Sequence, residues 1–193
     1  MSGNVPEKKQ KNIEIRDARE DDLPFLLEIY NEVIAKTTAV YSTELVTLEN
    51  RAAWFAQKKA AGFPVLVAQE VGEGGCVVVG YASLGEWRAA WSGYRYTVEH
   101  SVHVRADRRG AGIGQLLLDA LMTKGRALGM HVLLGAIDAA NEGSMRFHAR
   151  LGFVEVARFP QVGRKFGRWL DLVFMQAYLD APDAPRNDEQ EIP

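Results

Sequence analysis

The segment from Thr97 to Leu118 limits the possible folds more than any other part of the chain. Its beginning is rich in β-branched residues, as strands are: Thr97, Val98, Val102 and Val104. The basic, glycine-rich residues that follow suit a turn, and apolar residues at helical spacing come after Gly114: Leu116, Leu117, Ala120, Leu121 and, further on, Leu128. Gly129 then stands where a helix commonly ends. The sequence therefore predicts a strand, a glycine-rich turn and a helix in direct succession.

A turn of this kind can bind an anion. Glycines let backbone N–H groups approach a phosphate closely, and the N-terminus of a helix carries partial positive charge. Arg105, Arg108 and Arg109 add full charges beside the turn. A tight surface turn before a core helix remains the alternative, because glycine-rich strand–helix turns are common.

Two familiar phosphate motifs do not fit the turn. The dinucleotide fingerprint needs a glycine where Gln115 stands, and a Walker A loop needs Lys and Ser or Thr after its last glycine, where the chain has Gln115 and Leu116.

Length and composition describe an ordinary globular protein. The 193 residues suit one domain at 13–180, with polar tails at 1–12 and 181–193 that we expect to be disordered. The net charge of −2 gives no reason to expect nucleic acid as a partner, and no apolar run has membrane-spanning length. No signal peptide is recognisable at the N-terminus, so we expect a cytoplasmic protein. Cys76, the single cysteine, lies in an apolar run and is expected to be a buried thiol.

The remaining patterns predict a mixed α/β sheet. A first strand at 13–16 precedes a helix that begins near Asp22 and Pro24, and Thr47 can cap a second helix that ends at Gly62. The other expected elements are strands at 64–71 and 76–84 joined as a hairpin, an aromatic loop at 85–95, a strand at 131–137, a short helix from Asn141 to Arg150, a strand from 152, a basic loop at 160–168 and a last strand at 169–175.

Two motifs together resemble the GNAT (Gcn5-related N-acetyltransferase) superfamily. The turn reads Arg109-x-x-Gly112-x-Gly114 directly after a strand, and Asn141 is followed by Phe147-His-Ala-Arg-Leu-Gly-Phe153. The resemblance implies the GNAT fold, an α/β fold in which helices flank a mixed central sheet whose central strands splay apart. It also implies that acetyl-CoA is bound by Val102, His103, Val104, Arg109, Gly110, Ala111, Gly112, Ile113, Gly114, Gln115 and Asn141. A helix cap is the other reading of Asn141.

Four further stretches narrow the resemblance: 64–67, 80–83, 97–102 and 160–171. They look like the phosphinothricin acetyltransferase family, and more closely like its bacterial methionine sulfone and methionine sulfoximine N-acetyltransferases. This implies acetyl transfer to the α-amino group of a small amino acid by a homodimer, in which the 160–168 loop is a candidate to complete the partner's site. His148 stands where the wider superfamily has a tyrosine, so the tyrosine's role as general acid does not transfer directly.

Glu99 and His148 are the candidate catalytic residues. An α-amino group titrates near pH ~8 and must lose a proton before it attacks a thioester, so a base beside it helps. Glu99 precedes the turn on the predicted strand and can be this base, although a cross-strand ion pair would explain it too. His148 can protonate the leaving thiolate or contact the coenzyme, or it is a packed histidine. A backbone N–H along 102–104 can stabilise the oxyanion.

The substrate's carboxylate calls for positive charge. Arg88 and Arg95 flank the aromatic loop, and we expect Arg88, Ser92, Gly93, Tyr94 and Glu99 to bind the substrate. His100 and His103 lie three apart on a strand and so on opposite faces, and we expect no metal.

The sequence is also compatible with other functions. The same fold could acetylate a peptide N-terminus or an amine antibiotic, although the segment 87–95 carries two arginines and no acid, which disfavours a cationic antibiotic. A non-catalytic acyl-CoA-binding module would keep the turn without needing Glu99.

Overall fold

The structure, a computed structural model, describes residues 12–72 and 75–180. The tails expected to be disordered lie outside these residues, except for Asn12, which begins the first strand. None of the described helices is both long and apolar enough to cross a membrane.

The order of the elements is the one that the sequence predicts. They are β1 Asn12–Asp17, α1 Leu23–Lys36, α2 Leu48–Ala60, β2 Val65–Gly72, β3 Gly75–Glu86, β4 Thr97–Val104, α3 Ile113–Ala127, β5 Val132–Asp138, α4 Glu142–Arg150, β6 Val154–Lys165 and β7 Arg168–Tyr178. Short 3-10 turns occupy Glu20–Asp22, Ser92–Tyr94 and Ala106–Arg108.

Local chemistry sets several helix ends. Pro24 stands in the first turn of α1, where its missing N–H costs nothing. The Thr47 side chain accepts a hydrogen bond from the Asn50 N–H at 3.3 Å, which caps α2 as expected. At the two ends of α3, Gly112 and Gly129 take positive φ values of 80° and 71°, a conformation that glycine adopts without strain.

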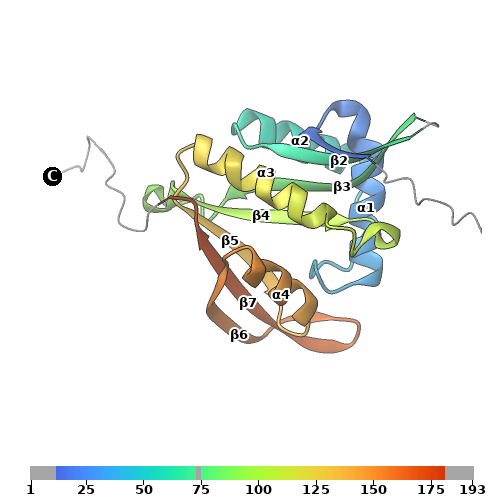
Figure 1. The fold of residues 1–193 in the computed structure, drawn as a ribbon. Coiled ribbons are helices and arrows are strands. Elements are labelled where there is room, and N and C mark those ends of the chain that lie inside the picture. The colour runs from blue at the N-terminus through green and yellow to red at the C-terminus, as the bar shows by residue number, and fades with distance from the viewer. Residues whose placement is uncertain (1–11, 73–74, 181–193) are drawn as a thin grey trace, which may run out of the picture.

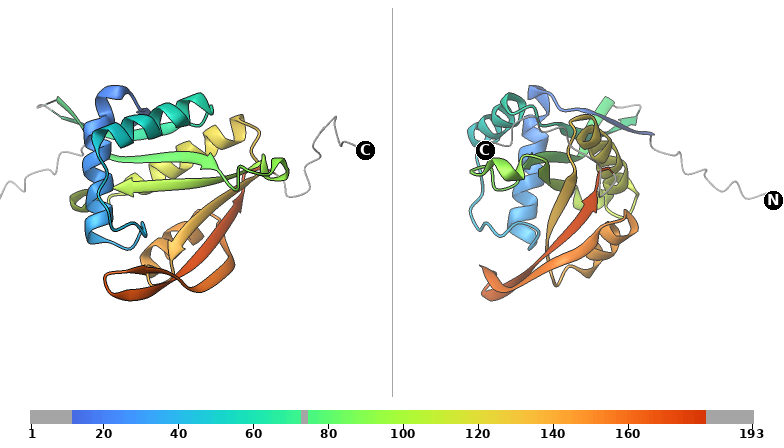
Figure 2. Two further views of the ribbon diagram at one scale, coloured as in Figure 1. Left: turned by 180° about the vertical axis from the view of Figure 1, so that it is seen from behind. Right: turned by 90° about the vertical axis from the view of Figure 1, so that its left-hand side faces the viewer.

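The strands form one mixed sheet in the order β1-β2-β3-β4-β5-β7-β6. Helices α3 and α4 cover one face (Figure 1), and α1 and α2 cover the other, as the view from behind shows (Figure 2). Each face has its own hydrophobic cluster, built from alternate residues of the same strands: Leu66 packs on the α3 side and Val67 on the α1 side. β4 therefore presents alternate side chains to two different environments.

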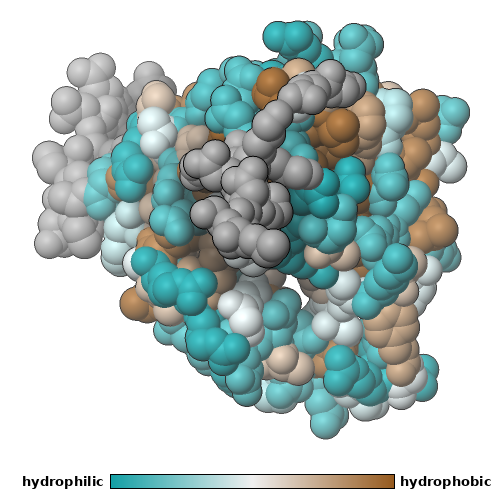
Figure 3. All heavy atoms as spheres, turned by 45° about the vertical axis from the view of Figure 1, so that its right-hand side comes forward, coloured by the Kyte–Doolittle hydropathy of each residue, from teal (hydrophilic) through white to brown (hydrophobic). Residues whose placement is uncertain are grey.

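β4 and β5 diverge in the middle of the sheet. They are the only parallel pair among the described strands, and they pair only at Thr97–Val132, Val98–Leu133 and Glu99–Leu134. Beyond Glu99 the two strands separate, which confirms the predicted splayed centre (Figure 1). The space-filling view shows a hollow in the surface at the level where β4 and β5 diverge (Figure 3). It lies between the helices in the upper half of the molecule and the lower half, which contains α4, β6 and β7.

Three expectations from the sequence are wrong. Cys76 is exposed, because the first residues of β3 extend beyond the core. Leu116 and Leu128 are exposed as well, since the core face of α3 is made by other residues: Ile113, Leu117, Leu118, Leu121 and Met122. The basic loop expected at 160–168 is instead a β-hairpin, in which β6 runs to Lys165 and β7 begins at Arg168. β6 is an edge strand with irregular pairing between Phe159 and Gly163, so Pro160 fits there without breaking the sheet.

Candidate active site

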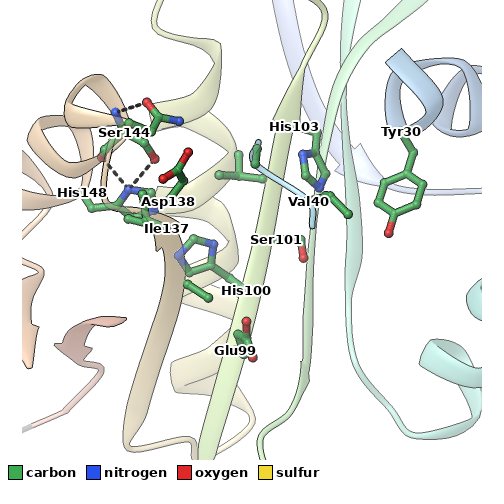
Figure 4. Close-up of a pocket in the computed structure, with 14 residues that line it drawn as sticks. Tyr30, Val40, Glu99, His100, Ser101, His103, Ile137, Asp138, Ser144 and His148 are labelled. Carbon is green, nitrogen blue, oxygen red and sulfur yellow. Dashed lines mark hydrogen bonds between the residues drawn. The ribbon is translucent and has the colours of Figure 1, made fainter. Parts of the chain in front are cut away.

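Two adjoining cavities lie where β4 and β5 separate. The first, of about 260 Å³, is lined by residues of α1, β4, β5 and α4 and by Ala39 and Val40 (Figure 4). The second, of about 610 Å³, lies between the glycine-rich turn and α4. Val102 and Ser144 line both, so the two cavities adjoin, with the turn beside the second and Glu99 in the first.

The turn exposes backbone donors to the second cavity. Among the described residues, none accepts a hydrogen bond from the N–H groups of residues 110–114. A Cβ added at Gly110 or Gly112 would meet no atom within 4 Å, so the main chain is open to a ligand there. These donors at the N-terminus of α3 are arranged as an anion site requires. They fit the diphosphate of a coenzyme.

The arginines around the turn are not equivalent. Arg105 pairs with Asp107 at 3.0 Å, and Arg108 pairs with Asp107 at 2.6 Å and with Glu70 at 2.7 Å. Arg109 makes no ion pair with a described residue; its Nε donates to the Val104 carbonyl at 3.1 Å. Of the three charges expected near a phosphate, two are therefore offset by carboxylates.

Arg150, on α4, lines the second cavity, although it is not among the site residues that the sequence predicts. Gly143, Phe147 and Arg150 follow a spacing of four and three residues, which places them on one helix face. This spacing is the signal that could have identified Arg150.

Glu99 lies in the first cavity, on the face of β4 that α1 and α2 cover. Burial raises the pKa of its carboxyl group, and the Lys58 ammonium opposes this increase. No cation of the described chain lies within 4.0 Å of the carboxylate, so the ion pair considered as an alternative does not form. A partly buried carboxyl with a raised pKa has the properties of a general base.

His148 is buried on the opposite face, between β4 and α4 (Figure 4). Its Nδ1–H donates to the Ser144 carbonyl at 2.7 Å, so Nε2 carries the lone pair in the neutral ring. Nε2 has no hydrogen-bond partner among the described residues, and burial lowers the pKa of the ring. Near neutral pH, Nε2 is therefore an acceptor without a partner among the described residues, on a side chain that lines the first cavity.

His100 stacks on His148, with ring centroids 5.0 Å apart and planes at 20°. Burial lowers its pKa to about 3, and neither ring nitrogen has a partner in the described chain. A Cβ at Gly135 would lie 2.7 Å from His100 Nε2, so only glycine leaves room for this ring where the strands part.

His103 faces the other way. Its ring contacts Tyr30 and Tyr81 at centroid distances of 5.8 and 5.2 Å, and burial lowers its pKa to about 4. The expected opposite orientation of His100 and His103 is confirmed. Within residues 12–72 and 75–180, no group of three or more metal-binding side chains occurs.

Asn141 caps α4. Its Oδ1 accepts from the Ser144 N–H at 3.0 Å, and the residue also lines the first cavity. The helix-cap reading is confirmed, and contact with a coenzyme stays a prediction.

The residues expected to bind the substrate are only partly brought together. Arg88 stacks over Trp91 and Tyr94, at 4.8 and 5.3 Å from its Cζ to their ring centroids, and Ser92, Gly93 and Tyr94 form a 3-10 turn. This group precedes β4, at the end remote from the glycine-rich turn, and lines neither cavity. Glu99 is the one member of the set that lines the first cavity. Substrate contact by the others stays a prediction.

Comparison with known proteins agrees with this geometry. The family described as "Acetyltransferase (GNAT) family" matches residues 26–153. An L-methionine sulfoximine/L-methionine sulfone acetyltransferase of Pseudomonas aeruginosa is 52% identical over 86% of this chain and 94% of its own. A phosphinothricin N-acetyltransferase of Alcaligenes faecalis is 35% identical over 88% of this chain and 84% of its own.

A solved structure supports the fold. The YncA protein of Salmonella typhimurium, solved with its cofactor acetyl-CoA, is 45% identical and superposes with a TM-score of 0.84 over 91% of this chain and 98% of its own. With a family match over more than half of its length, an open glycine-rich turn at the N-terminus of α3 and diverging central strands, this chain belongs to the GNAT acetyltransferase family.

Proposed function

We propose that this protein transfers the acetyl group of acetyl-CoA to the α-amino group of a small amino acid, in the cytoplasm. The acceptors that its relatives' names suggest are methionine sulfone, methionine sulfoximine and phosphinothricin. The observation that carries the proposal is the pair of adjoining cavities, one beside open backbone donors and the other holding a carboxyl group with a raised pKa.

The turn holds the diphosphate and β4 holds the pantetheine arm. The N–H groups of 110–114 bind the phosphate oxygens, with Arg109 and Arg150 beside them. Because the Arg105 N–H donates to Val79 on β3, alternation along β4 turns Val102 and Val104 toward the edge that β5 leaves. Their peptide groups can pair with the amides of the arm as a strand would.

Glu99 takes the proton that the α-amino group must lose, directly or through water. The amine nitrogen then attacks the thioester carbon, and the Val102 N–H donates to the oxygen that becomes negative. Collapse breaks the carbon–sulfur bond, and the proton that the attacking nitrogen loses as the amide forms goes to the departing thiolate of coenzyme A, directly or through water.

His148 contacts the coenzyme as an acceptor through Nε2. To protonate the thiolate it would need a proton on Nε2, which its lowered pKa and the Nδ1–H bond to Ser144 oppose near neutral pH. We therefore assign it a positioning role.

A thiol-release assay with acetyl-CoA and a panel of acceptors tests the activity. We expect release with methionine sulfone, methionine sulfoximine and phosphinothricin, and little release with a methionine-initiated peptide or an aminoglycoside. Release with the peptide or the antibiotic alone would favour another acceptor class. Acetyl-CoA binding without release from any acceptor would favour a non-catalytic module.

We also propose that the protein forms a homodimer through the β6–β7 hairpin. Large apolar side chains gather on this hairpin, each between 44% and 61% exposed: Val154, Val156, Phe159, Val162, Phe166 and Trp169. Such a concentration on a hairpin at the edge of the sheet is typical of an interaction surface (Figure 2). A second copy can cover the same surface symmetrically.

Replacing Val162 and Trp169 together with serine is expected to convert the dimer to a monomer. Light scattering after size-exclusion chromatography measures the mass. Leu128→Ser is the control, because Leu128 is also an exposed apolar residue but lies just beyond α3. A V162S/W169S protein that keeps the mass of a dimer would place the interface elsewhere.

A further inference from the structure

Lys58 is a partly buried cation that the mechanism above does not use. It lies in the last turn of α2, and its ammonium group rests on the main chain of β3 at Gly85. A Cβ added at Gly85 would come within 2.2 Å of Lys58 Nζ. Because Gly85 has no side chain, it leaves a space on β3 that the Lys58 ammonium occupies. We call this space the seat of the ammonium.

This seat is next to Glu99. Gly85 is the cross-strand partner of Glu99 in the β3–β4 register, and side chains at paired positions point to the same face of a sheet. The ammonium of Lys58 and the carboxylate of Glu99 thus lie side by side beneath α2. Each acts on the other: Lys58 lowers the pKa of Glu99, and Glu99 raises that of Lys58, in both cases against a larger effect of burial.

The two charges are neighbours without being in contact. No hydrogen bond or ion pair within 4.0 Å links Lys58 to any side chain in the part of the chain that the structure describes, and the same holds for Glu99. Both side chains are only partly exposed, and this burial lowers the pKa of Lys58 and raises that of Glu99. Partly dehydrated charges without partners gain most from a ligand that supplies the opposite charges.

We propose that Lys58 binds the α-carboxylate of the acceptor amino acid while Glu99 faces its α-amino group. This rests on the proposed function and names the chemical feature by which the site selects its acceptor. An amino acid carries a positive and a negative group on a single carbon, which matches one anion and one cation held close together. A peptide N-terminus or a simple amine has no carboxylate there and leaves Lys58 unpaired.

The test compares two acceptors in three proteins: wild type, Lys58→Met and Lys59→Met. The acceptors are L-methionine sulfone and its α-carboxamide, which differ only in the carboxylate. A hydrogen bond to a charged group is worth roughly 1.5–3 kcal/mol, so Lys58→Met is expected to lower kcat/KM for methionine sulfone by about 10- to 100-fold. It should change kcat/KM for the carboxamide by less than about twofold, well below the tenfold that 1.4 kcal/mol represents. Lys59→Met, the adjacent exposed lysine, should change neither.

Two further variants separate charge from structure. Lys58→Arg keeps the cation and should restore part of the preference for the carboxylate. Gly85→Ala keeps the lysine but fills its seat, so it should reduce activity on methionine sulfone selectively as well. Thermal unfolding of each variant shows whether it is folded, and if Lys58→Met does not fold, the other two decide.

Equal losses of kcat/KM on both acceptors would overturn the proposal, because Lys58 would then act only through Glu99. These outcomes differ from failure of the proposed function itself. In that case the wild-type protein would acetylate neither methionine sulfone nor any other amino acid of the panel.

Discussion

Replacing Glu99 with glutamine is expected to lower kcat/KM for the amino-acid acceptor by roughly 10²- to 10⁴-fold, the usual range for loss of a general base. Glutamine keeps the size and one acceptor oxygen of the side chain but cannot take up a proton. The second cavity, where the coenzyme is proposed to bind, does not include Glu99. The Kd of acetyl-CoA, measured by calorimetry, should therefore stay close to that of the wild type.

The dependence of kcat/KM on pH tests the role of Glu99 as a base by a second measurement. Glu99 acts as a base only when it is ionised, so wild-type kcat/KM should fall as the pH drops through its pKa. Because burial raises that pKa, the fall should begin nearer to neutrality than for an exposed glutamate. The Glu99→Gln protein should lose this acidic limb.

Glu86→Gln is the matched control. Glu86 is exposed, lies at the end of β3 and lines neither cavity, although it also acts on Lys58. It should keep activity within about twofold of wild type, as surface substitutions away from a site usually do. Full activity in Glu99→Gln, or an equal loss in both variants, would remove Glu99 from the role of base.

Replacing Gly112 with valine is expected to weaken acetyl-CoA binding by at least about tenfold, the equivalent of 1.4 kcal/mol. Gly112 is the N-cap of α3 and has a φ of 80°, in which a Cβ costs roughly 1–2 kcal/mol. No protein atom lies within 4 Å of the position that this Cβ would take. The new side chain would therefore project into the space that a phosphate needs to reach the N–H groups of 110–114.

The other end of the same helix provides the control. Gly129 has a φ of 71°, and a Cβ there would also meet nothing within 4 Å. Gly129→Val imposes the same kind of strain far from the turn, so both variants should lose similar amounts of thermal stability. Only Gly112→Val should lose affinity for acetyl-CoA in calorimetry. Equal affinities in the two variants would show that the turn does not bind the diphosphate.

The hairpin shows where prediction from the sequence reached its limit. Residues 160–168 hold a proline, glycines and basic side chains, which locally favour a loop. In the structure Gly163 pairs with Leu170, and the Tyr41 ring lies where a Cβ at Gly163 would be. Two contacts override the local preference for a loop: pairing with β7, and packing against Tyr41, which lies more than a hundred positions earlier in the chain. A local sequence pattern contains no information about such distant contacts.

The burial and pairing of individual side chains also depend on contacts that are distant in the sequence, so the local pattern did not predict them. Cys76 belongs to an apolar run that correctly predicts a strand, but the end of that strand extends past the helices that would cover it. Arg105 and Arg108 were correctly placed around the turn, but their charges are offset by Asp107 and Glu70, and Glu70 lies on a distant strand.

The sequence alone determined the order of the elements, the glycine-rich turn before α3 and the family. These features depend on periodicity, capping and backbone freedom, which neighbouring residues set within a few positions. Only the tertiary structure decided that Val102 and Ser144 line both cavities, that Arg150 lines the cavity at the turn, and that Lys58 lies on Gly85 beside Glu99. Each of these contacts depends on strand register and helix packing, which bring together residues from 14 to 42 positions apart. The physical reason is that the burial and the electrostatic environment of a side chain depend on its neighbours in space rather than along the chain.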